Sequence, residues 1–185
     1  MLTPEGRATV QGFLTRLNYL WMVMLGLVGV YVAITLLLVR GGMNLLGVDP
    51  SLFPLFTATL ALIGAGEILA MLWLDRRFAT PASLRRFIAG KGATAINIEI
   101  PDPRTLDDDR AALALLPHYF QAAVIRWSLI EVVGVYGLAL AFLTGQTLMP
   151  SVFYAMTVAL LIWRRANIGE VEGLLATVRT MDDGQ

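Results

Sequence analysis

Apolar and polar positions occur along the chain in long blocks. Residues 17–39 contain no charged side chain, residues 52–74 contain one, and two further apolar runs cover 119–143 and 148–163. About 20 apolar residues in a helix, at about 1.5 Å per residue, cross roughly 30 Å of hydrocarbon. The pattern therefore predicts an all-α, polytopic integral membrane four-helix bundle with amphipathic interfacial helices. The predicted parts are an N-terminal amphipathic segment (1–16), a first transmembrane hairpin (17–74), a cytoplasmic loop (75–118), a second transmembrane hairpin (119–163) and a cytoplasmic amphipathic tail (164–185).

The two terminal segments carry shorter apolar stripes. Thr3-Pro4-Glu5 is typical of a helix start, because Pro is favoured at the first helical position. We expect the first segment to be an amphipathic helix that lies on the membrane surface or runs straight into the first span. The tail repeats the helical spacing, and the apolar positions of its stripe are Ile168, Val171, Leu174, Leu175 and Val178.

The central segment is the only sizeable polar part of the chain. Residues 81–88 (PASLRRFI) suit either a short helix at an anionic membrane surface or a solvated loop. Residues 95–100 (AINIEI) alternate like a short strand. Thr105 followed by Asp107 and Asp108 predicts a helix N-terminus, where carboxylates are favoured by the helix dipole.

The amino-acid composition is typical of an integral membrane protein. Apolar residues make up 57% of the chain, charged residues make up 15%, and the mean hydropathy is +0.68. A soluble domain of this composition would expose a large apolar surface. The net charge of zero gives no global basic field for nucleic acid. The absence of Cys excludes disulfides and thiolate metal sites, and a single His cannot ligate a haem from both sides.

The basic residues are unevenly distributed between the loops. Twelve lie in the N-terminal segment, the central segment and the tail, whereas only Arg40 lies on the other side of the predicted spans. Cytoplasmic loops carry an excess of Lys and Arg, so both termini and the central segment should be cytoplasmic and the protein should be a multi-pass protein of the inner (cytoplasmic) membrane. The basic residues expected to contact lipid headgroups are Arg76, Arg77, Arg85, Arg86, Lys91, Arg164 and Arg165.

Two carboxylates fall inside predicted spans. Glu67 and Glu131 lie at comparable depth in the cytoplasmic half, and Arg126 lies one turn and a half before Glu131. Hydrocarbon offers no hydrogen bonds to a carboxylate, so such residues meet a partner, a cavity or a proton. Two readings stay open: a structural ion pair in which Arg126 binds Glu67 across the helix interface, or a proton or cation site formed by the two carboxylates.

Small residues accompany both carboxylates. Gly134, Gly137 and Ala141 form a stripe beside Glu131, while Gly64 and Ala70 flank Glu67. Small residues let membrane helices approach closely, so this pattern predicts that the second and third spans pack against each other with both carboxylates facing the bundle.

Other kinds of chemistry find little support in the sequence. The run Asp107-Asp108-Asp109 is expected to be a helix start, because three adjacent acids cannot converge on one ion from a single helix face. His118 is expected to be an interface residue at the start of the third span. The chain has no Gly-rich phosphate loop, no nucleophile elbow and no His-rich metal pattern, so we expect no enzyme, no cofactor and no metal.

Two local motifs resemble known families. R-W-x-L-x-E at 126–131, followed by F-L-T-G at 142–145, resembles a set of small bacterial four-helix membrane proteins of uncharacterised function. Residues 131–138 are also similar to the second helix of rotary ATPase proteolipid subunits, in which a membrane carboxylate, here Glu131, precedes Tyr-Gly-Leu. The proteolipid pattern also has a glycine-rich first helix and a short polar loop, which this chain lacks.

Two functions of different classes follow. The first is a structural, assembly or accessory subunit of a larger membrane complex, whose partners are the lipid bilayer and either other subunits or further copies of the chain. The alternative is a small oligomeric proton or cation channel or carrier that uses Glu67 and Glu131.

Overall fold

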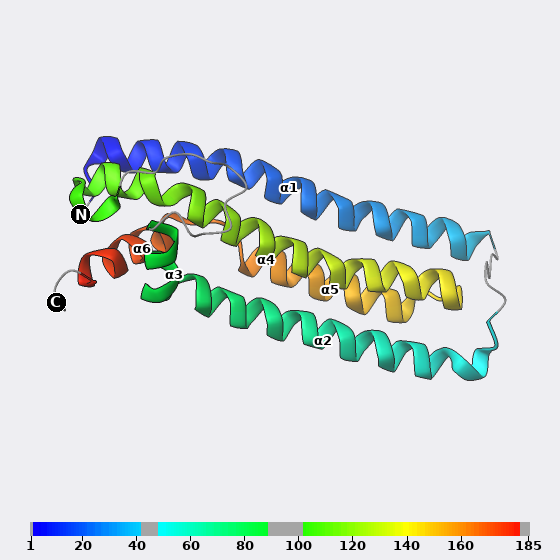
Figure 1. Ribbon diagram of the computed structural model, residues 1–185. Coiled ribbons are helices and arrows are strands. Elements are labelled where there is room, and N and C mark those ends of the chain that lie inside the picture. The colour runs from blue at the N-terminus through cyan, green and yellow to red at the C-terminus, as the bar shows by residue number, and fades with distance from the viewer. Residues whose placement is uncertain (1, 42–47, 89–101, 182–185) are drawn as a thin grey trace. The chain divides into compact units, whose positions relative to one another are not determined.

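A computed structural model describes residues 2–41, 48–88 and 102–181 (Figure 1). Every regular element in these residues is helical, which confirms the predicted all-α class. The predicted strand at 95–100 and the predicted lipid contact of Lys91 lie outside the described residues. Two short 3-10 turns, Pro50–Leu52 and Pro103–Thr105, precede α2 and α4. The helices are α1 (Pro4–Arg40), α2 (Phe53–Phe78), α3 (Pro81–Ile88), α4 (Asp108–Thr144), α5 (Leu148–Trp163) and α6 (Ile168–Thr180).

The beginning of α1 follows the predicted capping pattern. Thr3 accepts a hydrogen bond from the backbone N–H of Gly6 through its hydroxyl, at 3.1 Å, and from Arg7 through its carbonyl, at 2.9 Å. Pro4 then occupies the first helical position, where its missing N–H costs nothing. The helix continues to Arg40 without a break, so the N-terminal segment runs directly into the first apolar stretch.

α4 starts earlier than the apolar run that it carries. The Asp107 side chain accepts a hydrogen bond from the backbone N–H of Arg110, at 2.8 Å, and thereby caps the helix. The helix then passes through Pro117 to Thr144. Thr105, which the sequence places at the helix start, instead belongs to the preceding 3-10 turn.

The chain forms two compact units, and three of its helices contribute residues to both. Unit 1 contains residues 1–19, 73–126 and 166–185. Its buried apolar side chains come from α1, α3, α4 and α6, and α3 contacts α6. The apolar stripe predicted in the tail lies on the buried face of α6, where Val171, Leu174, Leu175 and Val178 are buried.

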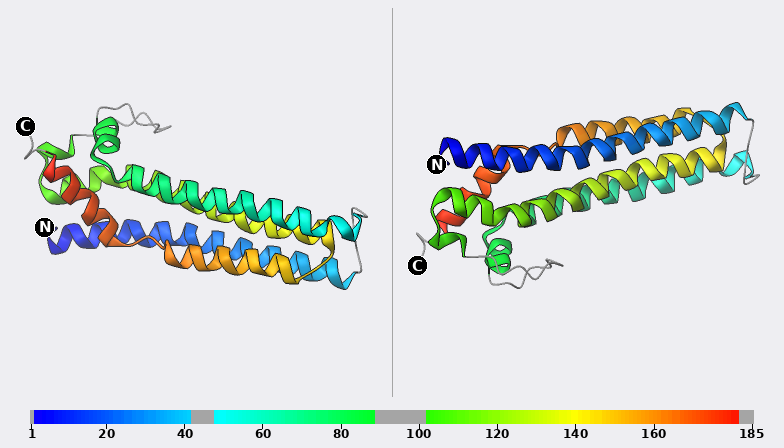
Figure 2. Two further views of the ribbon diagram at one scale, coloured as in Figure 1. Left: turned by 90° about the horizontal axis from the view of Figure 1, so that it is seen from below. Right: turned by 90° about the horizontal axis from the view of Figure 1, so that it is seen from above.

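Unit 2 contains residues 20–72 and 127–165. Both views of Figure 2 show its part of α2 running beside α4 and its part of α1 running beside α5. Val133 and Leu140 of α4 and Phe153 of α5 are buried at the centre of a hydrophobic cluster. The partly buried side chains packed around them are Phe56, Leu60, Ile68, Tyr136 and Met156.

Three helices are long and apolar enough to cross a membrane: α1, α4, and α2 together with the turn before it. The fourth predicted span coincides with α5, which has only 16 residues. Large apolar side chains are exposed along unit 2, including Leu37, Leu62 and Leu69. These lengths and surfaces fit a membrane protein.

Candidate functional site

Arg126 is the centre of a buried ionic cluster in unit 1. The residue is only 8% exposed, and its guanidinium reaches carboxylates from two other helices. Its Nη2 lies 2.6 Å from Asp75 Oδ1 at the end of α2, and its Nη1 lies 3.1 Å from Glu170 Oε2 in the first turn of α6. A buried guanidinium with two carboxylates joins three helices of this unit.

Glu170 and its surroundings are held by further hydrogen bonds. Asn167 caps α6 by accepting from the backbone N–H of Glu170, at 3.1 Å, and its own backbone N–H donates to the hydroxyl of Tyr119, at 3.3 Å. Tyr119, from α4, is fully packed. Glu170 also lies at the N-terminal end of α6, where a negative charge is favoured by the helix dipole. The cluster is thus ordered beyond the ion pairs themselves.

These contacts correct the predicted partner of Arg126. The sequence suggested that Arg126 binds Glu67 and holds the two membrane carboxylates in an ionised network. In the structure the partners of Arg126 are Asp75 and Glu170. The prediction missed Glu170 because residues 44 positions apart are brought together by the chain's path, which no periodicity encodes. The basic run that follows Asp75 made that acid look like part of a solvated helix end.

Trp127, next to Arg126, secures the end of α5 in unit 2. Its indole Nε1 donates to the carbonyl of Arg164, at 3.0 Å, and the indole of Trp21 on α1 donates to the carbonyl of Leu161, at 2.8 Å. The last carbonyls of a helix have no intrahelical donors. Two tryptophans from different helices therefore satisfy carbonyls at the C-terminal end of α5.

Glu131 lies in unit 2 and is also 8% exposed. The phenol of Tyr31, from α1, is near enough to interact with the carboxylate, yet neither carboxylate oxygen accepts a hydrogen bond of normal geometry from the described residues. Buried polar atoms are nearly always hydrogen-bonded, so this pair of oxygens is unusual. One turn further, Gly134 lies against Tyr31 and against Thr157 of α5.

Glu67 makes a different contact. The hydroxyl of Tyr136 on α4 donates to its Oε1 at 3.5 Å, a long hydrogen bond. Tyr136 follows Glu131 by five residues, which places the two side chains roughly 140° apart around the helix. The two carboxylates therefore have separate partners, and the predicted Glu67–Glu131 site is not assembled by the contacts of unit 2.

The small-residue stripe of α4 also has a different partner from the expected one. A Cβ added to Gly137 would lie 2.8 Å from Tyr154 Cε1 and 3.0 Å from the carbonyl oxygen of Pro150. The glycines of α4 therefore allow close approach of α5, not of α2. The packing of α2 on α4 is nevertheless present, since Gly64 lies against Tyr136.

His118, expected at the membrane interface, is buried among side chains of unit 1. Its Nε2 lies 3.1 Å from the carbonyl oxygen of Phe78, and its ring contacts Phe78 and Phe87. The residue connects the end of α2 and the face of α3 to α4 within unit 1.

The side chains of Asp107, Asp108 and Asp109 have three different partners, as expected for adjacent acids that cannot share one helix face. Asp107 caps α4, Asp108 binds Arg179 at 2.8 Å, and Asp109 accepts hydrogen bonds from Thr3. Across the ranges 2–41, 48–88 and 102–181, no group of three His, Asp or Glu side chains is arranged to hold a metal ion.

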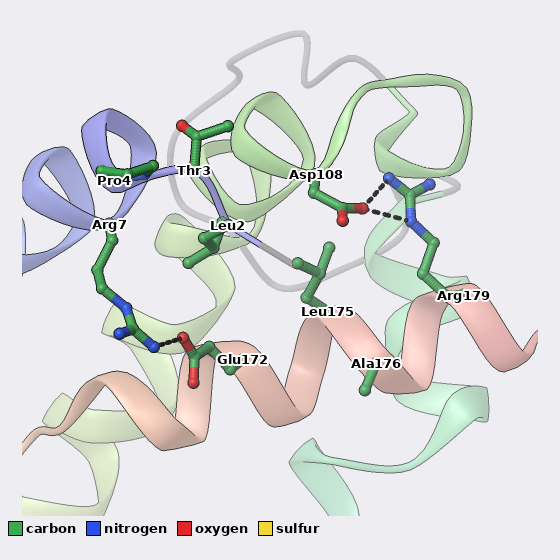
Figure 3. A pocket seen from close by; sticks show the side chains of 9 residues that line it. All are labelled: Leu2, Thr3, Pro4, Arg7, Asp108, Glu172, Leu175, Ala176 and Arg179. Carbon is green, nitrogen blue, oxygen red and sulfur yellow. Dashed lines mark hydrogen bonds and ion pairs between the residues drawn. The ribbon is translucent and has the colours of Figure 1, made fainter.

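A hollow of about 570 Å³ opens in unit 1 near the starts of α1 and α4 (Figure 3). Leu2, Leu175 and Ala176 give it apolar walls. Arg7 binds Glu172 at 2.7 Å, and Arg179 binds Asp108, so each lining arginine already has a carboxylate partner. The hollow therefore offers no unmatched arginine to an anionic ligand.

The arginines expected at the lipid surface differ in their surroundings. Arg76, Arg77, Arg85 and Arg86 are exposed. Arg164 stacks on Trp163 with 3.9 Å between the guanidinium carbon and the ring centroid, and Arg165 lies 5.5 Å from the ring of Trp21. Both arginines therefore make cation–π contacts with tryptophan rings.

Comparison with known proteins adds no family to these observations. No protein-family model matches the chain, and neither the curated proteins nor the solved structures contain a match. The resemblances of 126–131 and 131–138 thus stay predictions.

Proposed function

We propose that this protein is a multi-pass subunit of the inner membrane that assembles with other membrane proteins and has a structural or accessory role. Both termini and the segment at 75–118 face the cytoplasm, in accordance with the distribution of basic residues. Unit 2 crosses the bilayer as a four-helix bundle.

The observation that carries this proposal is an outward face of small residues on α1. Gly26, Gly29 and Ala33 are exposed, and a Cβ added to either glycine would meet nothing within 4 Å. The three positions fall within about 60° of one another on a helix of roughly 100° per residue. Membrane helix interfaces are enriched in such residues because they let backbones approach.

α2 has a comparable face. Ala58, Ala61 and Ala65 are exposed at helical spacing, whereas Gly64 and Met71 point into unit 2. A helix that met only lipid would have no need for small side chains at these positions. Two outward faces suitable for close packing favour a subunit that is covered by other membrane helices.

Purification of the tagged full-length protein in a mild detergent tests the proposal. The wild type should elute with other membrane subunits, and Gly29→Leu should lose them because the larger side chain prevents the close approach of another helix. Val23→Leu, on an exposed part of α1 outside the stripe, is the matched control and should keep them. Equal retention by both variants, or elution of the wild type as a symmetric homo-oligomer alone, would contradict an accessory role.

One observation favours a second candidate, a proton or cation channel or carrier. Glu131 is a buried carboxylic side chain beside the phenol of Tyr31, and its oxygens accept no hydrogen bond of normal geometry from the described residues. Ionisable residues in spans commonly mark ion pathways. If this candidate is correct, Glu131→Gln abolishes proton or cation flux in liposomes, whereas Glu67→Gln retains most of it. Wild-type liposomes without flux above protein-free liposomes exclude this function.

A further inference from the structure

α3 turns its apolar face towards the protein. Leu84 and Phe87 are buried, and the ring of Phe87 lies 4.9 Å from that of His118. Arg85 and Arg86 occupy the opposite side of the helix and are exposed. An amphipathic helix that enters a membrane must offer its apolar face to lipid. Since unit 1 already covers Leu84 and Phe87, the charged side chains that α3 presents outward are those of Arg85 and Arg86.

The last turn of α2 adds two more arginines. Arg76 and Arg77 are exposed, and only residues 79 and 80 separate α2 from α3. Arg77 stacks on Trp73 with 4.8 Å between its guanidinium carbon and the ring centroid, and Trp73 is 56% exposed. None of the four arginines forms an ion pair with any acid in the part of the chain that the structure describes.

Exposed guanidinium groups near the end of an apolar helix suit a phosphate group. The planar fork of arginine binds phosphate oxygens in a bidentate manner. An exposed tryptophan one turn before Arg77 is a typical residue of the headgroup level. The basic surface therefore follows directly after the apolar part of α2, where a phospholipid headgroup would lie.

We propose that Arg76, Arg77, Arg85 and Arg86 form a preformed docking surface for anionic phospholipid headgroups. The binding is electrostatic, without insertion of α3 into the lipid. This inference depends on the proposed membrane location, but not on the proposed role in assembly. Because the helices that carry the arginines are held by buried contacts, the surface is ready before the lipid binds.

Native mass spectrometry of the full-length protein tests this surface. The protein is incubated in detergent with equal amounts of phosphatidylglycerol and phosphatidylcholine, and the retained lipids are counted. The wild type should retain phosphatidylglycerol preferentially. Each arginine near an anionic surface contributes roughly fivefold in affinity, so Arg85→Gln/Arg86→Gln should lower this retention by at least about tenfold. Arg40→Gln/Arg110→Gln removes the same charge from exposed positions elsewhere and should change it less than about twofold.

Several outcomes decide the matter. Arg85→Lys/Arg86→Lys preserves the charge and should retain most of the binding, which separates lost lipid contact from misfolding of the glutamine variant. Retention should also fall as salt is raised. A wild type without preference for phosphatidylglycerol, or equal losses in both double glutamine variants, would overturn the inference. Membrane location is checked separately by resistance to alkaline extraction.

Discussion

At the scale of single residues, the buried charge of Arg126 imposes the strongest constraint. A guanidinium taken out of water costs several kcal/mol unless carboxylates and hydrogen bonds compensate it. Asp75 and Glu170 supply this compensation from the end of α2 and the start of α6. Removal of the arginine would leave two carboxylates in a poorly hydrated site. Removal of Arg126 alone should therefore lower the free energy of unfolding more than removal of Arg126 together with one of its carboxylate partners.

Arg126→Ala should lower the free energy of unfolding by on the order of 3–5 kcal/mol. Arg110→Ala, which removes an exposed pair with Asp107, should cost about 0–1 kcal/mol. Thermal unfolding in detergent measures both. Adding Glu170→Gln to Arg126→Ala should recover part of the loss, because one orphaned charge is removed while the shape is kept. Strict additivity of the two substitutions would show that Arg126 and Glu170 are not coupled.

Trp127 offers a second test on one residue. Trp127→Phe keeps an aromatic ring but removes the N–H that donates to the carbonyl of Arg164. A half-buried carbonyl that loses its donor costs on the order of 1 kcal/mol, so the melting temperature should fall. Trp163→Phe, at a position 60% exposed, should leave it nearly unchanged. Equal melting temperatures of the two variants would mean that the indole of Trp127 acts through its bulk alone.

At the scale of helices, close packing in unit 2 depends on the glycines of α4. Gly137 lies under Tyr154, Phe153 and the backbone of Pro150, so α5 rests directly on the helix backbone. Gly66 of α2 faces no other atom within 4 Å. Glycine therefore allows close helix packing on α4, whereas Gly66 of α2 lies on an open surface.

Gly137→Ala should destabilise unit 2 by about 1–3 kcal/mol, because the new Cβ would lie 2.9 Å from Phe153 Cβ. Gly66→Ala should be neutral or stabilising by up to about 1 kcal/mol, since alanine favours the helix and nothing is displaced. Thermal unfolding of the two variants gives the comparison. A more stable Gly137→Ala variant would show that α5 can move away without cost.

Features of the fold that depend on residues close together in the sequence could be predicted, whereas contacts between residues far apart in the sequence could not. The cap at Thr3, the stripe of α6 and the limits of α5 follow from local patterns, and the structure contains them. Periodicity also identified Gly137 as part of a close-packing face. It could not identify α5 as the helix on that face, because a period of 3.6 residues fixes a direction around a helix but names no neighbour.

Partners at long range were the harder part of the prediction. Arg126 was identified from its place beside an apolar run, yet its partners depend on how α2 and α6 reach α4. Likewise, His118 is buried because α3 packs against α4 within unit 1. The sequence of 81–88 left open whether this segment is a helix or a solvated loop. The exposed basic face of α3 follows from that same packing.

At the scale of the whole molecule, the distribution of basic residues predicts the orientation in the membrane. Reporter fusions after Arg40 and after Gly145 should report a periplasmic location, and fusions after Gly92 and Gln185 a cytoplasmic one. The reason is that Lys and Arg near the ends of spans resist translocation. A periplasmic signal after Gly92 would be incompatible with four spans of this orientation.

The central claim is that other membrane helices cover the small-residue faces of unit 2. The chain contains no Cys, so a single introduced thiol carries a photoreactive label at one known position. In native membranes, irradiation of labelled Ala61→Cys should give a discrete adduct with another protein. The control Ile63→Cys, about 160° away around α2, should give lipid adducts only. Lipid adducts alone at both positions, or the same protein adducts at both, would contradict the proposed assembly.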